Sequence, residues 1–158
     1  MADDNDVCAI CLEKKQLTVA TSCKHQFCFL CIKSMRFHHD NNYSDDDDKS
    51  FVCPLCRAPI DKIHLTCDLT PHNGGAKWAY SSRDCKWWMY DDRTSKTLEE
   101  HFQKNEVGCE IYLVGQWYDI DFKTMTQQQR NCPDKKRFIQ RNCQDTKGVA
   151  GVVYTRGH

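Results

Sequence analysis

Three segments decide the fold of this chain: Cys8-Ala9-Ile10-Cys11, Cys23-Lys24-His25-Gln26-Phe27-Cys28-Phe29-Leu30-Cys31 and Cys53-Pro54-Leu55-Cys56. They provide seven cysteines and one histidine in the order C-x2-C, C-x-H-x2-C-x2-C and C-x2-C. Each C-x2-C turn directs two thiolates toward one ion, and Zn2+ takes four sulfur or nitrogen ligands in a closed tetrahedral structural site. Eight ligands therefore predict two Zn2+ ions.

The spacing of the ligands also favours one way of pairing them. Cys23 and His25 are one residue apart, and Cys28 and Cys31 follow at once, so we expect an interleaved arrangement. One ion would be held by Cys8, Cys11, Cys28 and Cys31, and the other by Cys23, His25, Cys53 and Cys56. A disulfide framework is the alternative, but short paired spacings that include a histidine favour metal.

The length of the chain allows one ordinary domain or two small ones, since it has 158 residues. The zinc ligands favour two, because a segment of about 50 residues buries too little apolar surface to be stable alone. Structural zinc contributes roughly 10–16 kcal/mol to small peptides at neutral pH. We predict a zinc domain over residues 1–60 with an acidic loop insertion at 38–50, a connector at 61–76 and a second domain over 77–153.

Composition restricts the class of protein and its compartment. The formal net charge is zero, which argues against a protein that mainly coats nucleic acid, and no DNA partner is expected. No run approaches the roughly 20 apolar residues of a membrane span, and the acidic N-terminus is unlike a signal peptide, so no membrane association is expected. Five cysteines lack short paired spacing, which predicts free thiols in a reducing compartment, the cytosol and also the nucleus. They are Cys67, Cys85, Cys109, Cys132 and Cys143.

The second half of the chain has the pattern of a small antiparallel sheet with one helix. We predict strands at 78–81, 86–90, 110–114, 117–120, 125–129, 137–141 and 149–153, with residues 131–134 as a loop. Thr94 or Ser95 would cap a helix in which Leu98 and Phe102 lie one turn apart. In the first half, the absence of Gly and Pro over 29–37 predicts a short helix.

Both halves resemble known domain families. The ligand order, Phe27 before the fifth ligand and the ending Cys53-Pro54-Leu55-Cys56-Arg57 resemble the RING finger. Trp87-Trp88, together with Trp78, Tyr80 and residues 91–95, resembles the WWE domain, and the combination is similar to the poly(ADP-ribose)-directed RING–WWE ubiquitin ligases. The resemblance implies an α+β protein: a two-zinc cross-brace RING finger, then a WWE domain whose twisted antiparallel half-barrel sheet packs on one helix.

The RING resemblance implies docking of an E2 ubiquitin-conjugating enzyme that carries ubiquitin. Ile10, Met35 and Pro54 match the contact positions for the E2, and Arg57 matches the linchpin residue that bridges E2 and ubiquitin. Arg57 would be the catalytic residue, without any nucleophile of the chain's own. The alternative is that Ile10 and Met35 are core residues and that Arg57 is a solvated side chain.

The WWE resemblance implies a pocket for iso-ADP-ribose, the linkage unit of poly(ADP-ribose). The matching residues are Tyr80, Trp88, Tyr118, Gln127, Arg137 and Lys147, and Lys33 of the RING finger matches a residue that reaches the ligand. A core position is the alternative for Trp88, and a solvated helix lysine is the alternative for Lys33. Family members also switch the RING on when polymer binds.

The predicted function is that of a RING-type E3 ubiquitin ligase that recognises poly(ADP-ribosyl)ated proteins and ubiquitinates them. A poly(ADP-ribose)-binding adaptor without ligase activity is the main alternative. The least favoured alternative is a nucleic-acid-binding protein that uses the basic segment 123–147, because the total charge is zero. Family members continue into a tail that binds tankyrase and has no counterpart before His158, so a stable tankyrase complex is doubtful.

Overall fold

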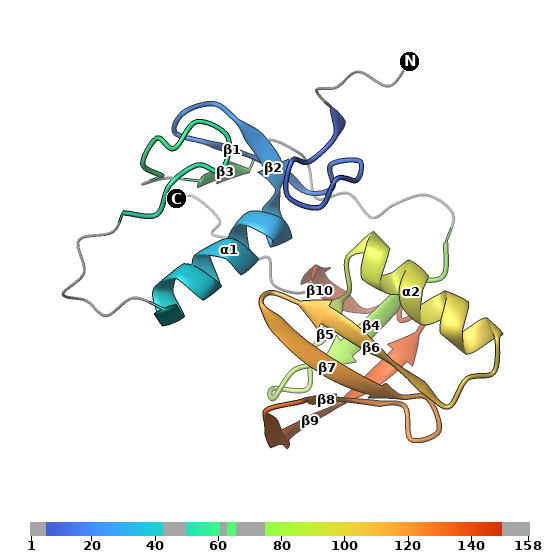
Figure 1. The fold of residues 1–158 in the computed structure, drawn as a ribbon. Helices are drawn as coiled ribbons and strands as arrows, with labels where there is room; N and C mark the ends of the chain where they lie inside the picture. The colour runs from blue at the N-terminus through green and yellow to red at the C-terminus, as the bar shows by residue number, and fades with distance from the viewer. Residues whose placement is uncertain (1–5, 43–49, 61–62, 66–74, 150–158) are drawn as a thin grey trace. The chain divides into compact units, whose positions relative to one another are not determined.

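The structure is a computed structural model that describes residues 6–42, 50–60, 63–65 and 75–149 (Figure 1). Its internal contacts divide the chain into two compact units, Met1–Thr70 and Pro71–His158. The division falls inside the predicted connector at 61–76. Residues 43–49 of the predicted acidic insertion and 150–153 of the last predicted strand lie outside the described part. None of the helices that the structure describes is long and apolar enough to cross a membrane.

The first unit consists of a three-stranded antiparallel sheet and one helix. Its elements are β1 (Thr18–Thr21), β2 (Gln26–Cys28), α1 (Phe29–Asn42) and β3 (Ile63–Leu65). β1 is the central strand and pairs with both others. Val19 on β1 and Phe27 on β2 are register partners whose side chains are both fully buried. The helix follows β2 without a loop, as Figure 1 shows, so the strand fixes where the helix starts.

The core of the first unit is small, and metal ligands make up much of it. Cys8, Cys28 and Cys53 are buried in the same cluster as five apolar side chains. These five are Val19, Phe27, Ile32, Phe51 and Ile60. The apolar side chains of this cluster, within the part of the unit that the structure describes, bury little surface for a unit of this size. The fold of this unit therefore depends on what the ligands bind.

Helix α1 is longer than the sequence predicts. It runs to Asn42, so residues 38–42, which we predict as the beginning of the acidic loop, are helical. Contacts one turn apart explain the extension. Arg36 forms an ion pair with Asp40 at 3.4 Å, and Asn41 Nδ2 donates to the carbonyl of Phe37 at 2.6 Å. Such pairs stabilise a helix even where composition is typical of a loop.

The second unit is a seven-stranded curled sheet with one helix, which confirms the predicted α+β half-barrel fold (Figure 1). The strand order is β10-β5-β4-β9-β8-β7-β6. In chain order the strands are β4 (Trp78–Ser81), β5 (Trp87–Met89), β6 (Gly108–Leu113), β7 (Gln116–Asp121), β8 (Thr126–Gln129), β9 (Cys132–Arg141) and β10 (Thr146–Val149). Residues 132–134, predicted as a loop, already belong to β9, and the turn before it is two residues long.

One edge of this sheet is parallel, although the sequence pattern predicts antiparallel pairing throughout. β10 pairs with β5 in the parallel sense, with Thr146 opposite Trp87. The other neighbours are antiparallel, so β9 and β5 run in the same direction. β10 keeps the direction of β9, and it can therefore meet β5 only in parallel. A pairing of this kind is set by distant strands and leaves no local signal in the sequence.

Helix α2 (Asp92–Gln103) begins earlier than predicted. Its N-cap is Asp91, whose side chain accepts a hydrogen bond from the backbone N–H of Thr94 at 3.4 Å and another from the Thr94 hydroxyl. The prediction of a cap at Thr94 or Ser95 is wrong, since both residues lie within the first turn. Asp91 has extended backbone angles and a carboxylate, which suit an N-cap better than a hydroxyl further along.

Aromatic side chains between α2 and the sheet form the core of the second unit. Trp78 on β4 is fully buried, and its ring lies 5.3 Å from that of Phe102 on α2 and 5.7 Å from that of Phe122. Leu98, one turn before Phe102, is also fully buried. Large aromatic groups bury much surface per residue, so this unit has an apolar core without metal.

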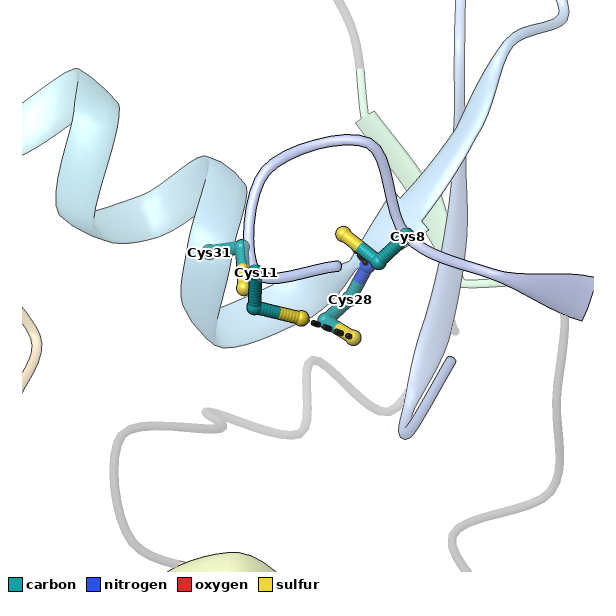
Figure 2. A group of neighbouring side chains, drawn as sticks. All are labelled: Cys8, Cys11, Cys28 and Cys31. Carbon is teal, nitrogen blue, oxygen red and sulfur yellow. Dashed lines mark hydrogen bonds between the residues drawn. The ribbon is translucent and has the colours of Figure 1, made fainter. Parts of the chain in front are cut away.

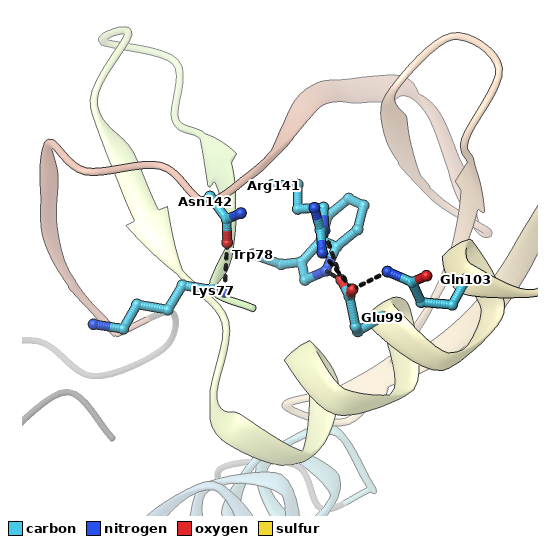
Figure 3. Close-up of polar contacts among 6 residues, drawn as sticks. All are labelled: Lys77, Trp78, Glu99, Gln103, Arg141 and Asn142. Carbon is cyan, nitrogen blue, oxygen red and sulfur yellow. Dashed lines mark hydrogen bonds and ion pairs between the residues drawn. The ribbon is translucent and has the colours of Figure 1, made fainter. Parts of the chain in front are cut away.

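A carboxylate network joins α2 to two strands, as Figure 3 shows. Glu99 accepts from the indole N–H of Trp78 at 2.9 Å and from Gln103 at 2.6 Å. Arg141 on β9 donates two bonds to the same carboxylate, at 2.8 and 2.6 Å. Beside the network, the backbone N–H of Lys77 donates to Asn142. The Arg141 guanidinium holds the pKa of Glu99 at about 2, well below its usual range.

Candidate zinc centres and ligand-binding face

The structure gathers the eight predicted zinc ligands into two groups. Within each group the ligand atoms lie within 4.8 Å of one another. The first group is Cys8, Cys11, Cys28 and Cys31, and the second is Cys23, His25, Cys53 and Cys56. Four thiolates, or three thiolates and an imidazole, fit tetrahedral Zn2+. The interleaved pairing and the two Zn2+ ions agree with the sequence prediction.

Different elements supply the ligands of the first group (Figure 2). Cys8 and Cys11 lie on a loop before β1, Cys28 ends β2, and Cys31 lies in the first turn of α1. The sulfur atoms of Cys11 and Cys28 are 3.9 Å apart. An ion at this position would therefore join the N-terminal loop, the sheet and the helix. That explains why four thiols can replace an apolar core.

Two of the C-x2-C segments form the same backbone turn. In the first, the N–H of Leu12 donates to Cys8 O at 2.8 Å and the N–H of Cys8 donates to Glu13 O at 2.9 Å. In the second, Arg57 donates to Cys53 O and Cys53 donates to Ala58 O, both at 2.8 Å. The residue after the second cysteine has φ 60° in both turns. The spacing C-x2-C therefore encodes a fixed turn that aims two sulfur atoms at one point.

Hydrogen bonds to sulfur prepare the cysteines to bind a cation. The backbone N–H of Gln16 donates to Cys28 Sγ at 3.2 Å. Thr21, which is buried, lies with its hydroxyl 3.0 Å from Cys23 Sγ. This hydrogen bond is the main reason why the pKa of Cys23 falls to about 6. A lower pKa favours the thiolate, which is the form that binds metal. Thr21 is a supporting residue that the ligand spacing does not reveal.

The predicted E2-contact residues differ in exposure. Ile10 and Met35 are half-buried and pack against the core of the first unit, while Pro54 is exposed. Arg57 is exposed and follows the last ligand at the left-handed backbone position described above. Leu55, beside Pro54, is 54% exposed and adds apolar surface that the sequence prediction leaves out. The roles of Ile10, Met35, Pro54 and Arg57 stay predictions.

The predicted iso-ADP-ribose residues of the second unit lie on six successive strands. From one edge inward they are Lys147 on β10, Trp88 on β5, Tyr80 on β4, Arg137 on β9, Gln127 on β8 and Tyr118 on β7. Cross-strand partners in a sheet share a face. Tyr80 is opposite Trp88, and Gln127 is opposite Arg137. The register through Ile139 and Ile120 places Tyr80, Arg137, Gln127 and Tyr118 on this same face. We call these four residues, together with Trp88, the ligand face.

Side-chain contacts within the ligand face are close. The Arg137 guanidinium lies 5.8 Å from the centre of the Tyr80 ring, and its Nη1 donates to the carbonyl of Ser81 at 3.5 Å. Burial raises the pKa of Tyr80 and of Tyr118, and the charge of Arg137 opposes that shift for both. The two phenols therefore stay protonated at neutral pH. The face combines one cation, aromatic rings and hydroxyl donors.

The surroundings of three other predicted residues do not single out a ligand contact. Trp88 is half-buried opposite Tyr80, which agrees with a pocket wall as well as with a core position. Lys147 is half-exposed and forms an ion pair with Asp145 at 3.8 Å. Lys33 is on α1 of the first unit, where its ammonium lies 5.6 Å from the Phe29 ring and burial lowers its pKa. Their ligand contacts stay predictions.

Sequence reasoning missed Tyr90, which is buried beside the ligand face. Its ring centre is 5.5 Å from that of Tyr80, and its hydroxyl donates to Gln127 Oε1. A signal was present, since Tyr90 lies two residues after Trp88 and alternation along a strand would place both on one face. The hydrogen bond itself joins residues 37 positions apart and could not be read from a local pattern.

Comparison with known families agrees with both halves of this geometry. The sequence model of the C3HC4-type zinc finger, or RING finger, matches residues 8–56. The model of the WWE domain matches residues 76–141. This chain joins a RING finger to a WWE domain.

Several curated relatives align with most of this chain. The chain is homologous to the E3 ubiquitin-protein ligase RNF146 of Homo sapiens, with 35% identity over 157 residues, which cover 92% of this chain and 40% of the relative. RNF146-A of Bos taurus is also 35% identical, over 156 residues that cover 92% of this chain and 42% of the relative. The E3 ubiquitin-protein ligase rnf146 of Salmo salar is 35% identical as well, and the alignment covers 92% of this chain and 42% of the relative. The chain therefore spans about two fifths of the length of the relatives it matches.

The two zinc sites of the RING finger leave no coordination position open for a substrate or water. Each zinc site has four protein ligands, so the coordination of Zn2+ is complete and no metal-bound water is available as a nucleophile. The two ions would therefore be structural. In the WWE domain, by contrast, the cation, the aromatic rings and the hydroxyl donors of the ligand face can recognise a charged ligand that carries a ring.

Proposed function

We propose that this chain is a RING-type E3 ubiquitin ligase that binds poly(ADP-ribosyl)ated proteins through its WWE domain and promotes ubiquitin transfer to them from an E2. The observation that carries the proposal is the set Tyr80, Tyr118, Gln127 and Arg137 on one sheet face, in a chain whose RING finger has two closed zinc sites. A ligand-binding domain and a domain for E2 docking are thus encoded together.

The chemistry of poly(ADP-ribose) suits the ligand face. Each repeat carries a pyrophosphate with two negative charges, an adenine ring and ribose hydroxyls. Arg137 is the cation of the face, and a guanidinium binds phosphate oxygens with charge-assisted hydrogen bonds. Tyr80 and Tyr118 can donate to phosphate, and an aromatic face can stack on adenine. Trp88, Lys147 and Lys33 would add further contacts to the polymer.

The RING finger would act by orientation. Holding the E2–ubiquitin thioester in a reactive geometry lowers the entropic barrier to attack by a substrate lysine. Ile10, Met35 and Pro54 would contact the E2. Arg57 is exposed beside the second zinc turn, and its planar fork of five N–H donors suits a bridge between E2 and ubiquitin. Free thiols and zinc thiolates suit the cytosol and the nucleus as its compartment.

The test is an autoubiquitination assay with purified E2 enzymes, with and without poly(ADP-ribose). We expect wild-type chain to form ubiquitin chains and to form more of them with polymer. Arg57→Ala should abolish chain formation but leave polymer binding intact, whereas Arg137→Ala should weaken polymer binding and remove the stimulation. Polymer binding with full zinc but no ubiquitin chains, over a panel of E2 enzymes, would support the adaptor instead.

A salt titration separates polymer recognition from general attraction to phosphate. Binding driven by backbone charge alone weakens steeply with salt. We expect poly(ADP-ribose) to stay bound at moderate salt and to be preferred over single-stranded RNA of equal charge. Equal affinity for RNA at every salt concentration would identify a nucleic-acid binder that uses its basic segment.

A further inference from the structure

Tyr90 is held rigidly at the junction between β5 and α2. Its backbone N–H donates to the carbonyl of Trp78 at 2.9 Å, and its own carbonyl accepts from the hydroxyl of Ser95 at 3.4 Å. The next residue, Asp91, is the N-cap of α2. The Tyr90 side chain is only 3% exposed. Strand and helix together therefore fix where the phenol lies.

The hydroxyl group of Tyr90 is hydrogen-bonded to the side chain of Gln127. Its hydroxyl donates to Gln127 Oε1, and Gln127 is itself only 4% exposed. Burial raises the pKa of Tyr90 well above its usual value, so this hydroxyl stays a donor throughout the physiological range. A hydrogen bond between two buried groups is worth more than one at the surface, because neither partner can turn to water instead.

The hydrogen bond from Tyr90 determines which atom of the Gln127 amide is available to a ligand. A glutamine amide has an acceptor oxygen and a nitrogen with two N–H donors. Since Oε1 accepts from Tyr90, Nε2 is the end that remains. Its cross-strand neighbour Arg137 also offers only donors. Two adjacent donor groups suit an anionic oxygen, whereas an amide turned the other way would place its oxygen against the same anion.

We propose that Tyr90 is a positioning residue that locks the Gln127 amide so that its Nε2 faces a pyrophosphate oxygen of the bound ligand. The proposal rests on the proposed function, which supplies an ADP-ribose unit as the ligand. Tyr90 acts through Gln127 and does not touch the ligand. Its effect on binding must therefore disappear when Gln127 is absent.

The first test needs no ligand. In uniformly 15N-labelled full-length chain with zinc, the side-chain NH2 resonances of Gln127 are assigned by their loss in Gln127→Ala. We expect a rigid amide, with a high heteronuclear NOE, in wild type and in Tyr112→Phe, a control on the opposite face of the sheet. Tyr90→Phe keeps the ring against Tyr80 and should lower the NOE to that of exposed glutamines. An unchanged Gln127 amide in Tyr90→Phe would overturn the proposal.

The second test is a double-mutant cycle by calorimetric titration with iso-ADP-ribose. Tyr90→Phe should weaken binding about tenfold in the wild-type background, which is the effect of one buried hydrogen bond. In Gln127→Ala it should change affinity by less than about twofold. Equal losses in both backgrounds would mean that Tyr90 acts by another route, and no loss in wild type would mean that it has no role. Failure of wild type to bind would reject the proposed function, and the NOE comparison would still decide the role of Tyr90.

Discussion

The RING finger and the WWE domain reach stability in different ways. In the described part of the RING finger, Cys8, Cys28 and Cys53 lie in the core together with five buried apolar side chains. In the WWE domain, Trp78, Leu98 and Phe122 are buried between sheet and helix, and the Glu99 network joins the same elements. The difference teaches that the first unit depends on its two metal sites for stability, whereas the second depends on aromatic packing. It can be tested because each unit can be destabilised separately.

Removing zinc should have the largest effect. Structural zinc contributes roughly 10–16 kcal/mol to small domains, so a strong chelator should unfold the RING finger. The WWE domain should stay folded. All four tryptophans, Trp78, Trp87, Trp88 and Trp117, belong to the second unit, so tryptophan emission reports on that unit alone. We expect far-UV circular dichroism to change on chelation while the emission maximum stays constant; a red shift of the emission would contradict separate stabilisation.

A cavity in the aromatic core should instead destabilise the WWE domain. Leu98 is fully buried on α2, and Leu98→Ala should lower the free energy of unfolding of the WWE domain by about 3 kcal/mol. Urea denaturation followed by tryptophan emission measures this loss. Lys96→Ala, at an exposed position of the same helix, is the control. Zinc content should stay at two ions per chain in both variants, and loss of zinc from Leu98→Ala would show that the units are not independent.

The Glu99 network predicts a smaller, pH-dependent effect. Its carboxylate has a pKa of about 2 in the folded state and 4.5 as its ordinary value. A lowered pKa gives stability that is fully present above about pH 4.5 and is lost as the pH falls toward 2. Glu99→Gln should therefore cost about 1–2 kcal/mol at pH 7, nearly the same down to about pH 4.5, and less as the pH falls further toward 2. Urea denaturation followed by tryptophan emission at several pH values measures this loss of stability without a contribution from the RING finger.

The matched control for Glu99 is one position further along α2. Glu100→Gln changes an exposed carboxylate whose partner is Lys96 at 3.9 Å. We expect almost no loss of stability, because exposed ion pairs contribute little. If Glu100→Gln and Glu99→Gln cost the same at pH 7, the network would have no special role in joining helix and sheet.

The smallest effect is expected on the outer face of the WWE sheet. Arg130 pairs with Glu110 and Asp119, and all three side chains are substantially exposed. Arg130→Ala should lower the free energy of unfolding far less than Leu98→Ala does, and less still at high salt. Urea titrations at low and high salt check this. A loss comparable to that of Leu98→Ala would mean that surface charge, rather than the core, stabilises this domain.

The zinc sites could be predicted from sequence because their geometry is local. Two of the three C-x2-C segments make the same local turn, shown by the matching hydrogen bonds around Cys8 and Cys53. The strands β4 to β8 agree with the predicted ones to within two residues, since alternation is local. β9 begins five residues before the predicted strand, and β10 begins three residues before it. The end of α1 was not, because its histidine- and asparagine-rich last turn resembles a loop until contacts such as Arg36 to Asp40 are known.

The parts that sequence did not reveal depend on distant partners. The parallel pairing of β10 with β5 follows from the directions of β9 and β4. The bond from Tyr90 to Gln127 can be foreseen only when the register of four strands, β5, β4, β9 and β8, is known. Thr21 becomes a partner of Cys23 only when the turn between them is formed. Residue types alone do not carry this information.

The most direct test of the central claim is discharge of an E2–ubiquitin thioester to free lysine in single-turnover conditions. This assay removes the substrate and measures only whether the RING finger orients the thioester. We predict that zinc-loaded wild-type chain with iso-ADP-ribose accelerates discharge at least tenfold over E2 alone, and that Arg57→Ala with the same zinc content does not. No acceleration by wild type, with full zinc and with each E2 of a broad panel, would contradict the account.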